Sequence, residues 1–262
     1  KESEAIYAKI GERCRANQVK IYNLYGKDMH VLHQNMLEKN VQYPKFWEMT
    51  VKHAMESHDI ISFDLDKTLF TSTYLWEIDF YEDIKTELQE RKIEIPDFTE
   101  RLMTLESEDN CASMEQLIVQ LIDAEKMPLE QRQEVQELIR DKIVEMFIPR
   151  TSMLEVVKDA IVSGKRVCLI EDKQGCRLSK TLWEKILRKH GLEGYDDIVC
   201  SADYGVGKLN GLYRVVMEQY GKSTYLHIGS DLESDILMPQ LYDMDTFLVK
   251  SAEELYKRLD PI

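Results

Sequence analysis

Strand-like and helix-like segments take turns over the C-terminal part of this chain, and this alternation limits the possible folds more than any other feature. Runs rich in β-branched and aromatic residues predict strands at residues 166–170, 196–201, 224–229 and 246–250. Segments with helical spacing of apolar residues lie between them, and glycines that suit a left-handed helix cap end three of these: Gly164, Gly191 and Gly221. We therefore predict an α/β fold with a Rossmann-like, doubly wound parallel sheet covered by helices on both faces.

A further strand is predicted in "DIISFDL", residues 59–65, well before this alternation begins. Between the two lies a block of amphipathic helix patterns that carries no strand signal and ends near Pro149. The first residues of the chain also have helical patterns. The predicted domains are a helical extension at 1–58, an α/β core at 59–72 and 148–262, and an inserted all-helical domain at 73–147.

Charged residues stand at or just after the end of each strand from the first to the fourth. They are Asp64, Asp66, Glu171, Asp172, Lys208, Asp231 and Asp235. Ligands of open parallel sheets bind outside the carboxyl ends of the strands, so we expect these side chains to converge. Two carboxylates 4 Å apart repel by about 4 kcal/mol at an effective dielectric constant near 20. Such a cluster requires a cation, and oxygen ligands that leave room for water and a phosphate suit Mg²⁺.

Paired acids beside a cation suit phosphoryl transfer. One aspartate can attack phosphorus and form an aspartyl-phosphate. A second acid two residues later can protonate the leaving oxygen and then activate water. A divalent cation and a lysine would stabilise the charge that develops on the phosphoryl group.

These motifs resemble those of the haloacid dehalogenase (HAD) superfamily of hydrolases. Its first motif, D-x-D-x-T after a strand, is matched by Asp64, Asp66 and Thr68. Its third motif, a lysine before a helix, is matched by Lys208, and its fourth, an acid pair such as G-D-x-x-x-D, by Asp231 and Asp235. Ser230 stands where that pair is usually preceded by glycine, and Lys67 stands at a position where glycine is common.

The resemblance implies a role for each matched residue. Asp64 would be the nucleophile, Asp66 the general acid and base, and Lys208 a catalytic residue that also binds the phosphoryl group. Thr68 is expected at the phosphate-binding site, where it would also hold the turn by hydrogen bonds. Mg²⁺ would be bound by the Asp64 side chain, the backbone carbonyl of Asp66, and one or both of Asp231 and Asp235. The helical insertion would be a cap that closes over the site and selects the substrate.

Glu171 departs from the family pattern, which has a serine or threonine that donates to a phosphoryl oxygen at this place. An ionised Glu171 would repel a phosphate at close range. Three interpretations stay open. Glu171 is protonated beside the other acids and donates a hydrogen bond; it turns away and Ser201 or a backbone amide replaces it; or the site no longer handles phosphate.

Composition excludes several classes of partner. The net charge of −14 repels nucleic acid, and the chain has no apolar run of 18 residues that would span a membrane. Five cysteines without a C-x-x-C pair are typical of reduced thiols, and the polar start is no secretory signal, so we expect a cytoplasmic protein.

The first residue is not methionine, and segments such as "YLHIGSDLESD" resemble a bacterial subgroup of HAD proteins associated with glycosyltransferases. We therefore expect this chain to be part of a longer polypeptide.

Two hypotheses follow from the sequence. The first is a Mg²⁺-dependent phosphohydrolase that acts on a small phosphorylated metabolite such as a sugar phosphate. The second, which Glu171 favours, is a catalytically degenerate domain of the same fold that serves as a scaffold or regulatory module of a larger surface-polysaccharide enzyme.

Overall fold

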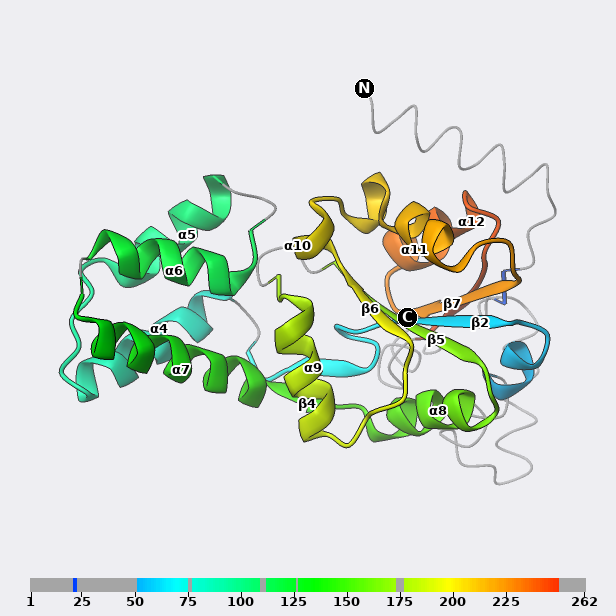
Figure 1. Ribbon diagram of the computed structural model, residues 1–262, viewed down its shortest axis with the longest axis horizontal. Helices are drawn as coiled ribbons and strands as arrows, with labels where there is room; N and C mark the ends of the chain where they lie inside the picture. Colours follow the sequence, from blue (N-terminus) through cyan, green and yellow to red (C-terminus); the bar gives the residue numbers. More distant parts are fainter. Residues whose placement is uncertain are drawn as a thin grey trace, which may run out of the picture.

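A parallel β-sheet forms the centre of the α/β core, which occupies the right half of the view in Figure 1. The computed structural model describes residues 21–22, 51–74, 77–108, 112–125, 127–172 and 177–249. The strands of the sheet, in spatial order, are β1 (Ile21–Tyr22), β8 (Asp245–Leu248), β7 (Tyr225–Gly229), β2 (Ile60–Asp64), β5 (Arg166–Glu171) and β6 (Asp197–Cys200). All of the neighbouring pairs are parallel. The predicted α/β fold with a doubly wound parallel sheet is confirmed.

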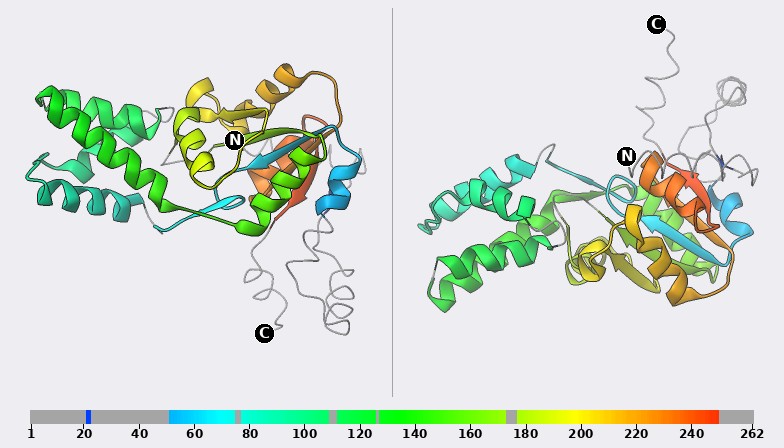
Figure 2. Two further views of the ribbon diagram at one scale, coloured as in Figure 1. Left: turned by 60° about the horizontal axis from the view of Figure 1, so that its bottom comes forward. Right: turned by 90° about the horizontal axis from the view of Figure 1, so that it is seen from above.

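Helices cover both faces of this sheet, as Figures 1 and 2 show. One face is covered by α8 (Thr151–Val162) and α9 (Lys180–Lys189). The other is covered by α11 (Leu212–Tyr220), with the short elements α10 (Ser201–Tyr204), η1 (Lys208–Asn210), η2 (Leu232–Leu237) and α12 (Met238–Gln240). Successive strand residues point to opposite faces: Ile61 and Phe63 belong to the apolar cluster that contains α8 and α9, and Ile60 to the one that contains α11.

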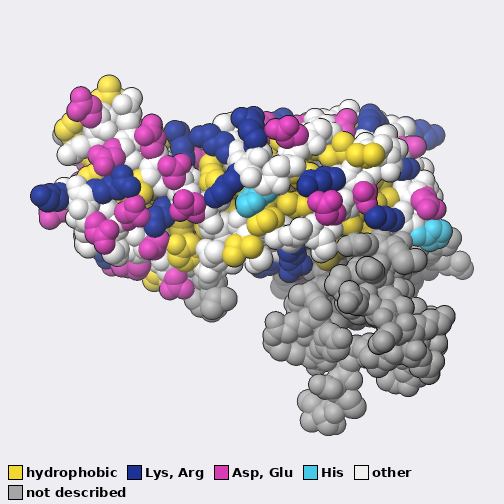
Figure 3. Space-filling view, turned by 90° about the horizontal axis from the view of Figure 1, so that it is seen from below, with side chains coloured by type: hydrophobic (Ala, Val, Ile, Leu, Met, Phe, Trp, Pro, Cys, Tyr) yellow, Lys and Arg dark blue, Asp and Glu magenta, His cyan; other side chains and the backbone are white. Residues whose placement is uncertain are grey.

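Four helices form an insert that extends away from the sheet (Figure 2). They are α4 (Glu77–Glu90), α5 (Phe98–Glu108), α6 (Met114–Ala124) and α7 (Leu129–Met146). Each buries an apolar stripe, and basic and acidic side chains both lie on the outer surface of the insert, at the left of Figure 3. A capping box between Ser113 and Gln116 begins α6. The predicted helical insert after the first strand is therefore present.

A two-stranded antiparallel ribbon joins the insert to the core. It consists of β3 (Phe70–Ser72) and β4 (Phe147–Pro149). Trp183 of α9 packs on this ribbon, with ring centroids 4.8 Å from Phe147 and 5.8 Å from Phe70. These fully buried rings fix the base of the insert against the core. The ribbon was not predicted from the sequence.

The N-terminal segment differs in one place from its predicted helical character. Ile21 and Tyr22 form the short edge strand β1, paired with β8, where only helices were expected. Residues 51–56 are helical. Residues 1–20 and 23–50 of the predicted extension lie outside the described residues. In the part of the chain that the structure describes, no helix has the length and apolar character needed to cross a membrane.

Candidate active site

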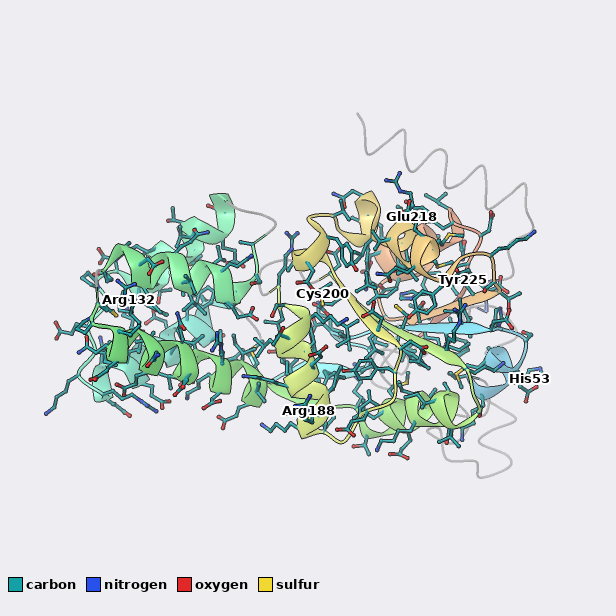
Figure 4. All side chains as sticks on the ribbon, in the orientation of Figure 1. His53, Arg132, Arg188, Cys200, Glu218 and Tyr225 are labelled. Carbon is teal, nitrogen blue, oxygen red and sulfur yellow. The ribbon has the colours of Figure 1, made fainter. Side chains whose placement is uncertain are left out.

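The predicted site residues lie at the carboxyl ends of the strands, at the end of the sheet that faces the insert. Cys200, at the end of β6, lies toward the insert, and Tyr225, which begins β7, lies at the far end of the sheet (Figure 4). Asp64 ends β2, the central strand, between β5 and β7. It pairs with Ile170, so Glu171 lies one residue beyond it on the neighbouring strand. Because the strands are parallel, Asp64, Glu171 and the residues after Gly229 all lie at the same end of the sheet, at the carboxyl ends of the strands.

Lys208 links two carboxylates from distant parts of the chain. Its ammonium nitrogen contacts Asp64 Oδ1 and lies 2.6 Å from Asp235 Oδ1. The exposed fractions of these side chains are 4% for Lys208, 7% for Asp64 and 2% for Asp235. Thr68 Oγ1 donates to Asp64 Oδ2 over 2.7 Å, which fixes the second oxygen of Asp64. The structure thus brings together Asp64, Thr68, Lys208 and Asp235.

Burial is the largest single influence on the pKa values of Asp64, Asp235 and Lys208. Removal from water, with the charge of Asp235, raises the pKa of Asp64 to about 7, although Lys208 and Thr68 act to lower it. Burial also acts to raise the pKa of Asp235, but Lys208 and His227 more than offset it, so the net shift is downward. Burial opposes the charge of Lys208, yet Asp235 and Asp64 hold its pKa well above the ordinary value. Lys208 is therefore a permanent cation between two acids of different basicity.

The turn after β2 brings Asp66 to the same place. Lys67, next to it, has a φ of 60°, a left-handed conformation that glycine adopts at lower cost. This conformation accounts for the preference for glycine at this position in the D-x-D-x-T motif. Asp66 is half-buried and lines the same cavity as Asp64.

The two acids after β7 have different roles. Asp235 Oδ2 accepts hydrogen bonds from the backbone amides of Ser230 and Asp231, at 3.0 and 2.9 Å. A side chain at Gly229 would put its Cβ 2.3 Å from the Cβ of Asp235, so only glycine leaves room for that residue. The exposed Asp231 instead caps the short π-helix η2, where its Oδ1 accepts from the amides of Glu233 and Ser234. The structure places Asp235 inside the site and Asp231 at its rim.

Glu171 is buried, with an exposed fraction of 1%, and lines a cavity of about 430 Å³. The same cavity is lined by Asp64, Asp66, Lys208 and both acids after β7, together with Lys67, Asp172, Leu209, Ser230, Glu233 and Ser234. Glu171 has therefore not turned out into solvent. Ser201, considered as its substitute, is buried at the start of α10 and is not among the residues that line this cavity.

Two further residues support the site: Asp172, one of the charged residues noted after the strands, and His227, which the sequence did not single out. Asp172 Oδ2 accepts a hydrogen bond from the backbone amide of Lys208, and Gly207 packs so closely that a Cβ there would lie 2.7 Å from this oxygen. Asp172 thereby positions the loop that carries Lys208. The second residue, His227, lies beside Asp235, and a signal for it was available because it is a polar residue in the middle of the apolar strand "YLHIG".

The donor atoms of the cavity suit a magnesium ion. In the described segments, no three His, Cys, Asp or Glu side chains converge as ligands of one ion. Mg²⁺ does not need such a cage, because one or two carboxylates with several waters usually hold it. Asp64, the Asp66 carbonyl and the acids after β7 could supply these oxygens, and the Lys208 ammonium already lies as a cation between two of the carboxylates.

Comparison with solved structures places this architecture in a known fold. A 2-haloacid dehalogenase from Pseudomonas syringae superposes with a TM-score of 0.51 at 17% identity, over 73% of this chain and 86% of that one. A HAD family enzyme from Bacteroides thetaiotaomicron superposes with a TM-score of 0.52 at 14% identity, over 79% of this chain and 100% of that one. The chain has a HAD-like fold. Another structure of the Bacteroides enzyme, with a TM-score of 0.49, is described as a complex with magnesium and inorganic phosphate. No family model matches the sequence, and no curated protein matches it.

Proposed function

We propose that this chain is a Mg²⁺-dependent phosphohydrolase of the HAD superfamily that acts on a small phosphorylated metabolite such as a sugar phosphate. The observation that carries the proposal is the buried contact of Lys208 with Asp64 and Asp235 at the wall of a cavity. Burying three charged side chains costs several kcal/mol per ion unless their mutual attraction offsets it. Such an arrangement is characteristic of sites that use charge for chemistry.

The first chemical step would form a bond between Asp64 and phosphorus. An oxygen of the Asp64 carboxylate attacks the phosphoryl group, and the bond from phosphorus to the alcohol oxygen breaks. The carboxyl group of Asp66 gives its proton to that oxygen, so the product leaves as an alcohol. Lys208 holds Asp64 in place and offers its positive charge to the phosphoryl oxygens.

The second step would return the enzyme to its starting state. Asp66, now a carboxylate, removes a proton from a water molecule as that water attacks phosphorus, and the bond to Asp64 breaks. Inorganic phosphate leaves, and Asp64 regains its carboxylate. Bound Mg²⁺ would supply positive charge that neutralises the phosphoryl group and favours the ionised form of Asp64.

The size of the cavity suits a small substrate. Its volume of about 430 Å³ lies within the usual range for small-molecule sites. Leu209 is the apolar member of an otherwise polar lining, which favours a hydrophilic ligand. The insert begins and ends at the ribbon β3–β4, a few residues beyond the D-x-D-x-T motif, so we infer that it acts as the cap that selects the substrate.

The proposal is tested by measuring phosphate release from a panel of phosphorylated sugars and other small metabolites, with and without Mg²⁺. The unmodified chain should release phosphate from at least one of them in a Mg²⁺-dependent manner. Asp64→Asn should abolish release while it preserves the folded state. Asp79→Asn, which changes an exposed acid on α4, is the matched control and should leave the rate unchanged. A rate that survives Asp64→Asn would refute the assignment of the nucleophile.

A second function is favoured by the burial of Glu171 in the cavity. An unprotonated carboxylate there would repel a phosphate dianion, as Asp231 and Glu233 would at the rim. On this account the chain is a catalytically degenerate domain that acts as a scaffold or regulatory module of a larger surface-polysaccharide enzyme. The resemblance of "YLHIGSDLESD" to glycosyltransferase-associated proteins supports this second candidate.

Glu171→Ser distinguishes the two functions. If Glu171 is protonated and donates to a phosphoryl oxygen, serine can replace the donor only in part, and the rate of phosphate release should fall. If Glu171 closes the site to phosphate, the substitution should create activity that the unmodified chain lacks.

A further inference from the structure

A hydrogen-bonded network of three buried side chains lies beside Asp235, on the side of the sheet that α11 covers. Its members are Ser62, His227 and Tyr213. His227 is in the middle of β7 and is fully buried. Its Nδ1 lies 2.8 Å from Ser62 Oγ on β2, and its Nε2 lies 3.1 Å from the hydroxyl of Tyr213 on α11. The Nε2 atom is also 3.6 Å from Asp235 Oδ1. A polar group at such depth is costly unless its hydrogen bonds are satisfied.

The neighbouring hydrogen bonds determine which group donates and which accepts in this network. The Tyr213 hydroxyl donates to the backbone carbonyl of Ser234 over 2.8 Å, so its oxygen can only accept from His227. Ser62 has two acceptors in reach, His227 Nδ1 at 2.8 Å and the Leu226 carbonyl at 3.5 Å, and the shorter contact has the better geometry. Ser62 therefore donates to Nδ1, and the ring proton lies on Nε2.

The opposite tautomer would be unfavourable. With the proton on Nδ1, the lone pair of Nε2 would face both the oxygen of Tyr213 and a carboxylate oxygen of Asp235. Because Ser62 donates to Nδ1, that nitrogen carries no proton, and the ring is neutral. The Nε2–H group thus points at the pair of oxygens formed by the Tyr213 hydroxyl and Asp235 Oδ1.

The oxygen of Asp235 that faces His227 is also the one that contacts Lys208. Asp235 Oδ1 lies 2.6 Å from Lys208 Nζ, and Oδ2 accepts from two backbone amides. The carboxylate is thus held on one side by the turn after β7 and on the other by Lys208 and His227. Any rotation of Asp235 would move Lys208, which in turn contacts Asp64.

We propose that His227, in its neutral Nε2–H form and fixed by Ser62 and Tyr213, is a positioning residue for Asp235, and through it for Lys208 and Asp64. It does not touch the cavity, since the lining residues do not include it. Its effect on a phosphoryl ligand rests on the proposed function, whereas its contact with Asp235, 3.6 Å from Nε2 to Oδ1, does not. The two parts can therefore be tested separately.

The first test concerns the tautomer and needs no ligand. A long-range nitrogen–proton NMR spectrum of the histidine rings, assigned with His227→Gln, should show His227 protonated at Nε2. Tyr213→Phe removes one acceptor and leaves Asp235 as the other, so the ring should stay protonated at Nε2. A proton on Nδ1 in the unmodified chain, or a switch to Nδ1 in Tyr213→Phe, would show that Asp235 does not accept from His227 and would overturn the proposal.

The second test measures the apparent affinity for beryllium fluoride in the presence of Mg²⁺, since beryllium fluoride mimics an aspartyl-phosphate. His227→Leu removes the N–H group that faces Asp235, and we expect an affinity lower by about 10- to 100-fold, the usual effect of losing a supporting polar partner behind a ligand. His227→Gln keeps a donor near the place of Nε2 and should restore most of the affinity. Equal affinities in the Leu and Gln variants would contradict the positioning role.

The outcomes separate this inference from the proposed function. If the unmodified chain does not bind beryllium fluoride, the proposed function fails, and the tautomer in Tyr213→Phe still decides whether His227 holds Asp235. If His227→Leu does not fold, the same NMR comparison decides. If binding occurs and both His227 variants retain it fully, the proposed function stands and the role of His227 is refuted.

Discussion

The raised pKa of Asp64 makes the stability of this protein depend on pH in a particular direction. Burial and the charge of Asp235 raise it from 3.8 to about 7. The unfolded chain releases this proton near pH 4, and the folded chain keeps it until about pH 7. Between these values the folded state binds more protons than the unfolded state. The contribution of Asp64 to the free energy of unfolding is therefore fully present below pH 4 and is lost as the pH rises through 7.

The size of this effect follows from the shift. One pKa unit corresponds to about 1.4 kcal/mol, so a rise from 3.8 to about 7 corresponds to roughly 4 kcal/mol. Asp235, whose pKa is lowered, contributes with the opposite sign, but it does so below its ordinary value of 3.8 and thus outside this pH window. Asp64→Asn removes the titrating group and keeps nearly the same shape. The unmodified chain should therefore lose up to roughly 4 kcal/mol more than Asp64→Asn between pH 4 and pH 8.

The assay is urea-induced unfolding at a series of pH values, in the presence of a chelator so that no divalent cation binds Asp64. Plotting the difference in unfolding free energy between the two proteins cancels the titration of all other groups that they share. Asp79→Asn on the insert serves as the control and should follow the unmodified chain. Parallel pH profiles for the unmodified chain and Asp64→Asn would refute the assignment of a raised pKa to Asp64.

Three further changes test the contacts around this group by urea-induced unfolding near pH 8. Lys208→Met leaves Asp64 and Asp235 buried without their cation and should reduce the free energy of unfolding by about 3–5 kcal/mol; a loss below 1 kcal/mol would contradict the contact. Gly229→Ala forces a Cβ against Asp235 and should cost about 1–3 kcal/mol, so unchanged stability would show that Asp235 lies elsewhere. Asp231→Ala removes the cap of η2 and should cost about 1 kcal/mol, and a loss as large as that of Lys208→Met would place Asp231 inside the site.

The sequence predicts the sheet and the position of the site at the carboxyl ends of its strands, because both depend on short-range patterns. The strand ending at Asp64 is apolar before that residue except for Ser62, and the one ending at Glu171 is apolar from Val167 to Ile170, which is typical of buried parallel strands. Once parallel strands are assigned, their carboxyl ends must lie at the same end of the sheet. The proximity of Asp64, Glu171 and Lys208 could therefore be predicted from the sequence alone. The ribbon β3–β4 could not, because strands of three residues are too short to show a period.

The roles of individual acids depended on turns that the sequence does not specify. Asp231 and Asp235 are equivalent in the motif, and the choice between them is made by the turn after Gly229, which directs Asp235 inward and leaves Asp231 as a cap. Asp172 belongs to none of the matched motifs, yet its side chain accepts a hydrogen bond from the backbone amide of Lys208, 36 residues away. Contacts of this kind join loops whose relative position is decided by packing of the whole core.

The most direct test of the central claim is a thermal melt with Mg²⁺ alone and with Mg²⁺ plus beryllium fluoride, for the unmodified chain and for Asp64→Asn. Ligand at 100 times its dissociation constant adds about 2.7 kcal/mol, which corresponds to roughly 5–10 °C in Tm for a chain of this size. We predict that the combination stabilises the unmodified chain by this amount and leaves Asp64→Asn unchanged. Stabilisation by Mg²⁺ alone, with no further effect of beryllium fluoride, would contradict a working phosphoryl site.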